Sequence, residues 1–167
     1  MNQNQHVQLF KDVMGNYPTG VTVVTTVNEE QKPLGLTVNS FASVSIDPLL
    51  ILWSIDKRVS SYDVFTNTDK FAVHILASDQ GEICNLFASR VEDRFANCEW
   101  EMSKHDLPVI AKASAVLQCK TYKTVEAGDH MILIGEVIDI QDEKKEPLLY
   151  HKRTFGPIPN EFYQVKS

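Results

Sequence analysis

Residues 33–62, PLGLTVNSFASVSIDPLLILWSIDKRVSSY, contain the two patterns on which the prediction of the fold depends. Residues 49–53 form an unbroken apolar run, as expected of a strand that is buried on both faces. Small hydrogen-bonding residues precede this run where strands usually carry bulk, and two cations and two serines follow it. These residues are Thr37, Asn39, Ser40, Ser43 and Ser45 before the run, and Lys57, Arg58, Ser60 and Ser61 after it. A buried strand with such groups at both ends predicts a site for a polar ligand.

Strand patterns continue on both sides of this stretch. Residues 21–27 are all β-branched, which favours a strand, and they are expected to pair with 33–41 in a hairpin. Further strands are predicted at 42–46, 49–55, 71–76, 113–125, 131–140 and 147–150. Residues 91–112 are expected to be a loop with at most one helical turn, and the C-terminal tail is expected to be irregular. Mostly sequential antiparallel strands indicate a small β-barrel or sandwich with helical additions.

Three short helices are expected between these strands. Apolar residues at helical spacing predict the first at 6–15. Ser60 with Asp63, and Asp79 with Glu82, have the spacing of N-terminal capping pairs and predict helices that begin there. The helix after Asp79 is expected to end at about Arg90. Neither repeats nor a linker interrupt the pattern, so we expect one domain over residues 1–167.

Composition and charge exclude several classes of protein. A chain of 167 residues can bury a full core without disulfides or metals. The net charge of −6 argues against a nucleic-acid surface, because phosphate contacts need clustered cations. The N-terminus lacks a signal peptide's apolar segment, and no apolar run approaches the roughly 20 residues that span a bilayer. Three widely spaced cysteines argue against a disulfide framework and predict reduced thiols in a cytoplasmic protein.

The common catalytic and cofactor motifs are missing from the sequence. No G-x-G-x-x-G follows a predicted strand, which argues against a Rossmann domain. Gly15 and Gly20 have the outer spacing of a phosphate loop, and Thr22 fits its Ser or Thr position, but Val21 occupies the position that needs Lys. No serine lies in a nucleophile elbow. His-x-x-x-His and Glu-x-x-His pairs are absent, so no metal site is expected.

One anion site follows from the residues themselves. Ser60 and Ser61 lie at a predicted helix N-terminus, where free N–H groups favour an anion, and Lys57 and Arg58 could add charge-assisted bonds. Alternatively, Ser60 only caps the helix while the cations are solvated. The polar residues at 37–40 likewise either contact a ligand or satisfy nearby backbone groups. A ligand with a polar ring system and a phosphate would use both groups of residues.

Nine segments distributed over the chain form a more specific pattern. They are 10–24 (FKDVMGNYPTGVTVV), 35–45 (GLTVNSFASVS), 47–49 (DPL), 56–62 (DKRVSSY), 71–76 (FAVHIL), 93–96 (DRFA), 127–130 (AGDH), 134–137 (IGEV) and 147–151 (PLLYH). In this order they resemble the short-chain flavin reductase family of split-barrel, FMN-binding proteins. That family includes the reductase components of two-component flavin-dependent monooxygenases.

The resemblance implies a mainly β fold, a Greek-key split β-barrel with a few short helices. It implies a homodimer with FMN or FAD bound in a groove near the subunit interface. The implied activity is that of an NAD(P)H:flavin oxidoreductase, which passes a hydride from NADH or NADPH to flavin N5. Reduced flavin would then supply a partner monooxygenase.

The resemblance also implies roles for individual residues. Along the isoalloxazine ring would lie Thr37, Val38, Asn39 and Ser40. The ribityl chain and phosphate would be held by Ser54, Ile55, Asp56, Lys57, Ser60 and Ser61. Nearer the outer part of the flavin would lie Phe87, Ala88 and Arg94. His130 would be the catalytic residue that places the nicotinamide, and the nicotinamide-binding segment would contain Tyr150, His151, Lys152 and Arg153.

Two other functions remain open at this stage. One is a flavin-binding oxidase or sensor on the same fold, and the other is a non-catalytic protein that binds haem or another small ligand. The sequence does not decide between FMN and FAD or between NADH and NADPH. It also leaves the partner oxygenase unidentified.

Overall fold

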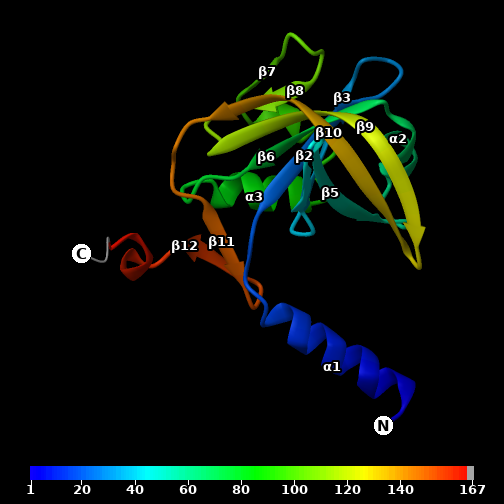
Figure 1. Ribbon diagram of the computed structural model, residues 1–167, viewed down its shortest axis with the longest axis vertical. Coiled ribbons are helices and arrows are strands. Elements are labelled where there is room, and N and C mark those ends of the chain that lie inside the picture. The colour runs from blue at the N-terminus through cyan, green and yellow to red at the C-terminus, as the bar shows by residue number, and fades with distance from the viewer. Residues whose placement is uncertain (165–167) are drawn as a thin grey trace.

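A seven-stranded antiparallel sheet forms the body of the computed structural model, which describes residues 1–164 (Figure 1). Its strand order is β3-β2-β6-β9-β10-β5-β4. The strands are β2 (Thr22–Val27), β3 (Pro33–Val38), β4 (Ala42–Ile46), β5 (Leu49–Asp56), β6 (Lys70–Ile75), β9 (Ala115–Ala127) and β10 (His130–Asp142). The two ends of the sheet, β3 and β4, do not pair with each other within the described residues, so the barrel is split. The predicted mainly β split-barrel fold is confirmed.

Two smaller sheets and several short helices complete the fold. One sheet has the order β1-β11-β12, and the other pairs β7 with β8. Their strands are β1 (Thr19–Gly20), β11 (Leu148–His151), β12 (Thr154–Pro157), β7 (Trp100–Met102) and β8 (Pro108–Ile110). The helices are α1 (Gln3–Gly15), α2 (Tyr62–Asn67), α3 (Gly81–Ala88) and the 3-10 helices Phe95–Asn97 and Asn160–Tyr163. The main-sheet strands, β11 and α1 lie within three residues of their predicted bounds.

The prediction of residues 91–112 and of the tail was partly wrong. β7 and β8 form a hairpin where a loop was expected, and β12 forms in the tail. Their sequences are too short to carry a strand pattern, so contacts from distant residues are needed to fix them. For β8 these contacts are hydrogen bonds from Thr25 Oγ1 to the carbonyl oxygen of Pro108 (2.6 Å) and from the Ile110 N–H to His74 Nε2 (3.0 Å).

Neither predicted capping box forms. Helix α2 has Ser61 as its N-cap, and α3 has Gln80, and neither side chain makes the capping bond. For α3 a buried glutamine replaces the expected cap. Gln80 accepts a bond from the Ala77 N–H (3.0 Å) and donates to the carbonyl oxygen of Ala111 (2.9 Å). This side chain therefore fixes the start of the helix by one local bond and one long-range bond, to Ala111, that the sequence pattern does not contain.

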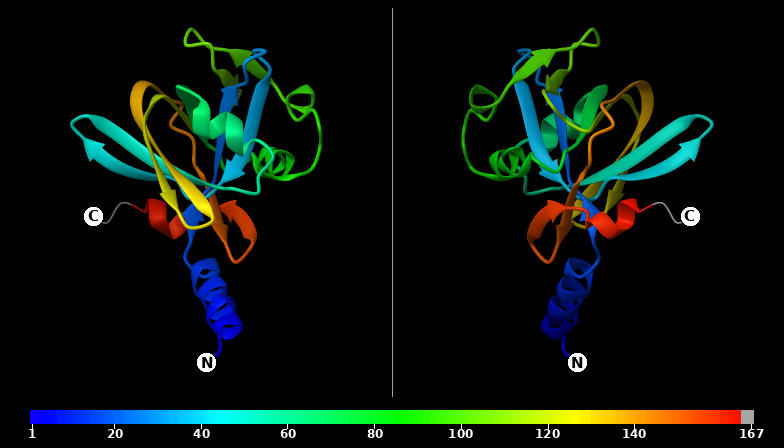
Figure 2. Two further views of the ribbon diagram at one scale, coloured as in Figure 1. Left: turned by 90° about the vertical axis from the view of Figure 1, so that its right-hand side faces the viewer. Right: turned by 90° about the vertical axis from the view of Figure 1, so that its left-hand side faces the viewer.

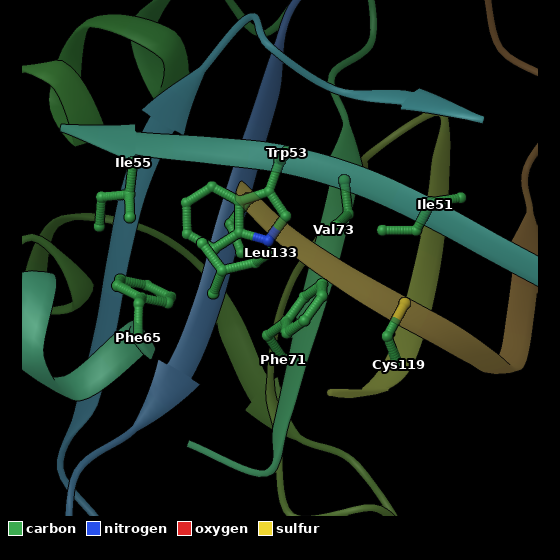
Figure 3. Packing of buried hydrophobic residues seen from close by; sticks show 9 residues of the cluster. Ile51, Trp53, Ile55, Phe65, Phe71, Val73, Cys119 and Leu133 are labelled. Carbon is green, nitrogen blue, oxygen red and sulfur yellow. The ribbon is translucent and has the colours of Figure 1, made fainter. Parts of the chain in front are cut away.

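Trp53 is at the centre of the main core (Figure 3). Its ring meets Phe65 and Phe71 edge-to-face, at centroid distances of 5.2 and 5.9 Å. From Ile51 onwards along β5, buried residues alternate with more exposed ones, and Leu49 is 45% exposed. The expectation that this strand is buried on both faces was therefore wrong for the single chain. An antiparallel sheet of this kind packs mainly one face against its core.

Two elements project from the body of the molecule. Helix α1 extends away from the sheets and has no buried residue, and the β4–β5 hairpin projects on another side (Figure 2). Both carry apolar side chains that the chain itself leaves uncovered. These include Phe10 (67% exposed) and Val13 (59%) on α1, and Ile46 (88%) on the hairpin. Within residues 1–164 no helix combines the length and apolar character that crossing a membrane requires.

Candidate flavin site

A small cavity of about 330 Å³, called here the inner cavity, lies at the C-terminal end of β3. It brings together six of the residues predicted for the site from distant parts of the sequence. They are Thr37, Val38, Asn39, Ala88, Tyr150 and Arg153. The β1-β11-β12 sheet contributes the last two, because β11 pairs with β1 directly before β2. Residues of the predicted ring-binding and nicotinamide-binding segments therefore share one cavity, and Ala88, which was expected nearer the outer part of the flavin, lines this inner cavity instead.

Two of the predicted hydroxyls in this region already have backbone partners. Thr37 Oγ1 donates to the carbonyl oxygen of Cys84 on α3 at 2.8 Å. Ser40 Oγ accepts a bond from the Ser54 N–H at 2.9 Å and donates to the Ser54 carbonyl oxygen at 3.2 Å. These bonds tie β3 to α3 and the end of β3 to β5. Asn39 is exposed and makes no side-chain hydrogen bond to other described residues, so its amide can reach a ligand.

A larger cavity of about 810 Å³, called here the outer cavity, adjoins the N-terminal half of β3. Ser60, Ser61 and Arg94 line it, as predicted for the phosphate end and the outer part of the ligand. Gly35 lines the outer cavity and Thr37 the inner one, and residues two apart on a strand face the same side about 7 Å apart. The two cavities therefore follow one another along β3.

Ser60 and Ser61 are available to an anion in the outer cavity. Their hydroxyls bond to no other group within residues 1–164, and Ser61 makes no capping bond. The alternative that Ser60 only caps the helix does not hold, because the N-cap is Ser61. Helix α2 is only six residues long, so at this end of the cavity the two hydroxyls, and not the helix N-terminus, are the groups offered to an anion.

Arg94 fixes the loop that closes the outer cavity. Its guanidinium donates to the carbonyl oxygens of Gly35 (2.6 Å) and Ser89 (2.5 Å), and burial lowers its pKa. Phe87, also predicted for the site, is 1% exposed and packs edge-to-face on Phe95 at 5.1 Å. A Cβ on Gly35 would lie 2.7 Å from the Phe87 ring. These residues shape the cavity, and Phe87 presents little surface to a ligand.

The predicted cations Lys57 and Arg58 are paired with carboxylates and line neither cavity. Arg58 Nη2 lies 2.7 Å from Asp56 Oδ2, and this pairing holds the pKa of the Asp56 carboxyl well below its usual range. Lys57 Nζ donates to Glu126 Oε1 at 2.5 Å, which lowers the pKa of Glu126 and raises that of Lys57. Ile55 is 1% exposed in the core, so only its backbone could contact a ligand.

His130 lies in this charged region, at the turn between β9 and β10. It pairs with Asp56 in the sheet register, and its Nδ1 lies 2.7 Å from Asp129 Oδ1. This hydrogen bond lowers the pKa of the Asp129 carboxyl. His130 lines neither cavity, so one chain does not bring it to Tyr150 and Arg153.

The turn between β11 and β12 contacts the end of helix α1. His151 Nε2 lies 3.2 Å from Asn16 Oδ1, and the Lys152 N–H donates to the carbonyl oxygen of Gly15 at 2.9 Å. Of the four residues predicted here, Tyr150 and Arg153 reach the inner cavity. His151 and Lys152 instead tie the turn to α1.

Several cavity residues carried no signal in the sequence. Lys32, Arg90 and Trp100 line the outer cavity, and Asn85 and Phe155 line the inner one. Three of these lie in turns or in regions of mixed charge, where position cannot be inferred from periodicity. In the part of the chain that the structure describes, no three His, Cys, Asp or Glu residues are grouped as metal ligands would be.

The split barrel therefore has two cavities along β3, and both are lined by residues that were predicted for a flavin site. Residues 14–159 match the flavin reductase like domain, and the chain belongs to that family.

Similar proteins agree with this assignment. Over 137 residues the chain is 47% identical to the reductase component of a flavin-dependent trigonelline monooxygenase from Acinetobacter baylyi, covering 82% of this chain and 44% of that protein. It is 40% identical over 147 residues to the FMN reductase (NADH) SmoA of Agrobacterium fabrum, covering 88% and 83%.

A solved structure gives the same fold. The NADH:FAD oxidoreductase SgcE6 of Streptomyces globisporus, in complex with NAD and FAD fragments, superposes with a TM-score of 0.87 at 35% identity, covering 95% of this chain and 96% of that one. The first two curated relatives are longer proteins, of which this chain spans 44% and 45%.

Proposed function

We propose that the chain is an NAD(P)H:flavin oxidoreductase, which passes a hydride from NADH or NADPH to N5 of FMN or FAD. The observation that carries the proposal is the pair of adjoining cavities along β3. The inner one collects Asn39 with Tyr150 and Arg153, and the outer one collects Ser60 and Ser61. Family membership and the FMN reductase (NADH) SmoA, of which the chain spans 83%, support the same activity.

The residues present fit a flavin mononucleotide unit. The ring would lie in the inner cavity, where the backbone of 37–40 and the Asn39 amide can donate to its N1–C2=O edge. The phosphate would accept bonds from the unpaired hydroxyls of Ser60 and Ser61. Hydride transfer is the chemistry that flavin and nicotinamide supply themselves, and the protein provides position and electrostatics. Tyr150 and Arg153, which line the same cavity, would hold the nicotinamide nucleotide against the ring.

We also propose that the chain is a homodimer. No residue of helix α1 is buried within its own chain. Exposed apolar side chains on the projecting elements include Phe10, Val13 and Ile46. A second copy would cover these surfaces and could bring His130 to the inner cavity. Sedimentation equilibrium should give twice the monomer mass, and Phe10→Glu should shift the protein towards monomer. A monomeric native protein at micromolar concentration would refute this assembly.

Reduced flavin would serve a flavin-dependent monooxygenase. The support is the relative from Acinetobacter baylyi, whose name places it as a reductase component of such an enzyme. The three cysteines are free, which suits the cytoplasmic location that we propose. We also propose that residues 1–167 fold as one domain. The described residues of the site do not identify the oxygenase or its substrate.

The direct test is steady-state oxidation of NADH and NADPH with added FMN, FAD, riboflavin or no flavin. A reductase that treats flavin as substrate oxidises the nucleotide only when flavin is added. Oxidation that needs no added flavin would instead indicate a protein with tightly bound flavin, and a haem spectrum would indicate a binding module. His130→Ala should lower the rate with NAD(P)H and leave the flavin dissociation constant nearly unchanged. Equal losses in both would contradict its role beside the nicotinamide.

A further inference from the structure

We propose that the outer cavity binds the adenylate half of FAD, so that the chain prefers FAD to FMN. This inference rests on the proposed flavin site and deepens it. The relatives leave the choice open, since one is named an FMN reductase and another an NADH:FAD oxidoreductase. The residues of this chain decide it through the shape, chemistry and rigidity of the cavity.

The shape of the site exceeds what FMN can fill. A flavin whose ring lies in the inner cavity and whose phosphate meets Ser60 and Ser61 ends there if it is FMN. The outer cavity continues past these serines to Lys32 on the β2–β3 turn and to Trp100 on β7. Its volume of about 810 Å³ compares with about 330 Å³ for the inner cavity. An FMN molecule would leave most of this space to water, whereas FAD has a further phosphate, ribose and adenine to place there.

The chemistry of the lining suits those three groups. Lys32 and Arg90 are exposed and form no ion pair with other described residues, so both can meet the second phosphate. Glu92 and Asp93 also line the cavity, and carboxylates can accept bonds from ribose hydroxyls. Asp93 Oδ1 already accepts a bond from the Ala96 N–H at 3.0 Å, whereas the Glu92 carboxylate bonds to no other described residue.

The cavity also has a net cationic lining in an acidic chain. Three cations (Lys32, Arg90 and Arg94) line it against the two carboxylates, although the whole chain carries a net charge of −6. This local excess of positive charge favours a dianionic pyrophosphate, although the net charge of the whole protein repels anions.

Trp100 provides an aromatic surface for the adenine. It is half-buried in the cavity wall and packs edge-to-face on Phe95 at a centroid distance of 5.3 Å. Phe95 packs in turn on Phe87, and Arg94 binds the loop to the β3 backbone, so the wall is fixed before a ligand arrives. A preformed aromatic wall loses little entropy on binding, and stacking on it accepts a purine without further hydrogen bonds.

The test compares dissociation constants for FMN and FAD, measured by quenching of flavin fluorescence with the full chain. We expect FAD to bind at least about tenfold more tightly than FMN. Trp100→Leu should remove most of this preference by weakening the binding of FAD alone. Trp100→Phe, which keeps an aromatic ring, should retain the preference. Arg90→Glu should weaken FAD more than FMN. The matched control is Lys123→Glu, which makes the same charge change at an exposed residue on β9. It should leave the ratio of the FMN and FAD dissociation constants unchanged.

Each outcome separates this proposal from the one on which it rests. Equal affinities for FMN and FAD, in a protein that reduces both with NAD(P)H, would overturn the adenylate site and leave the reductase intact. A FAD preference that survives both Trp100→Leu and Arg90→Glu would overturn it too. If Trp100→Leu lowers the thermal midpoint, Arg90→Glu decides, since that residue is exposed. Failure to bind any flavin would overturn both proposals.

Discussion

His74 should make the stability of the fold fall in mildly acidic solution. The side chain is completely buried, and each ring nitrogen has a backbone partner. Nδ1 donates to the carbonyl oxygen of Val23 at 2.9 Å, and Nε2 accepts from the N–H of Ile110 at 3.0 Å. A proton on Nε2 would face that N–H donor in a dry interior. Burial therefore lowers the pKa of His74 from its usual 6.5 to about 4.

The magnitude follows from the difference between the two pKa values. The unfolded chain takes up a proton at a higher pH than the folded chain, so stability is full well above 6.5 and is lost as the pH falls towards 4. Each pKa unit corresponds to about 1.4 kcal/mol, which gives a total of about 3 kcal/mol. About 2 kcal/mol of this is lost between about pH 7 and pH 5.

Urea unfolding at these two pH values measures the effect. With a slope of about 2 kcal/mol per molar urea, the midpoint should fall by about 1 M on acidification. His74→Gln is the control, because a glutamine can also donate to Val23 and accept from Ile110 but does not titrate. Its midpoint should depend much less on pH than that of the native chain. An equal fall in both proteins would refute the assignment to His74.

Three further perturbations test the site. Gly35→Ala places a Cβ 2.7 Å from the Phe87 ring, so it should destabilise the fold by about 1–3 kcal/mol and weaken flavin binding; an unchanged thermal midpoint would show that the ring can move aside. Ser60→Ala with Ser61→Ala should raise the FMN dissociation constant about tenfold or more, with riboflavin as the control that must not change. Arg94→Ala removes the hydrogen bonds to the carbonyl oxygens of Gly35 and Ser89, so calorimetry should give a lower thermal midpoint and FAD titration a weaker affinity. Full retention of both would mean that the loop is held by its other contacts.

The strand pattern and the inner cavity could largely be predicted from the sequence. The run at 49–53 and the segment at 21–27 identify β5 and β2, because short continuous apolar or β-branched runs favour strands. The family resemblance supplied the residues that meet in the inner cavity, including Asn39, Tyr150 and Arg153. Periodicity alone could not, since these residues come from different sheets.

What could not be predicted depends on contacts between distant residues. Lys57 looked available to a phosphate, but its ion pair is with Glu126, 69 positions away in the sequence. Gln80 fixes the start of α3 through the carbonyl of Ala111, so the expected capping pair was not needed. The hairpin that holds Trp100 likewise depends on His74 and Thr25, and its own three-residue strands carry no pattern.

Anaerobic mixing of the purified protein and flavin with NADH or NADPH tests the central claim most directly. The proposed reductase should bleach the absorbance of oxidised flavin with one nucleotide consumed per flavin, and only when the protein is present. Deuterium at the transferred position of the nicotinamide should slow this bleaching, because the carbon–hydrogen bond breaks in the step observed. Flavin that binds to the protein but is reduced by neither nucleotide would contradict the account.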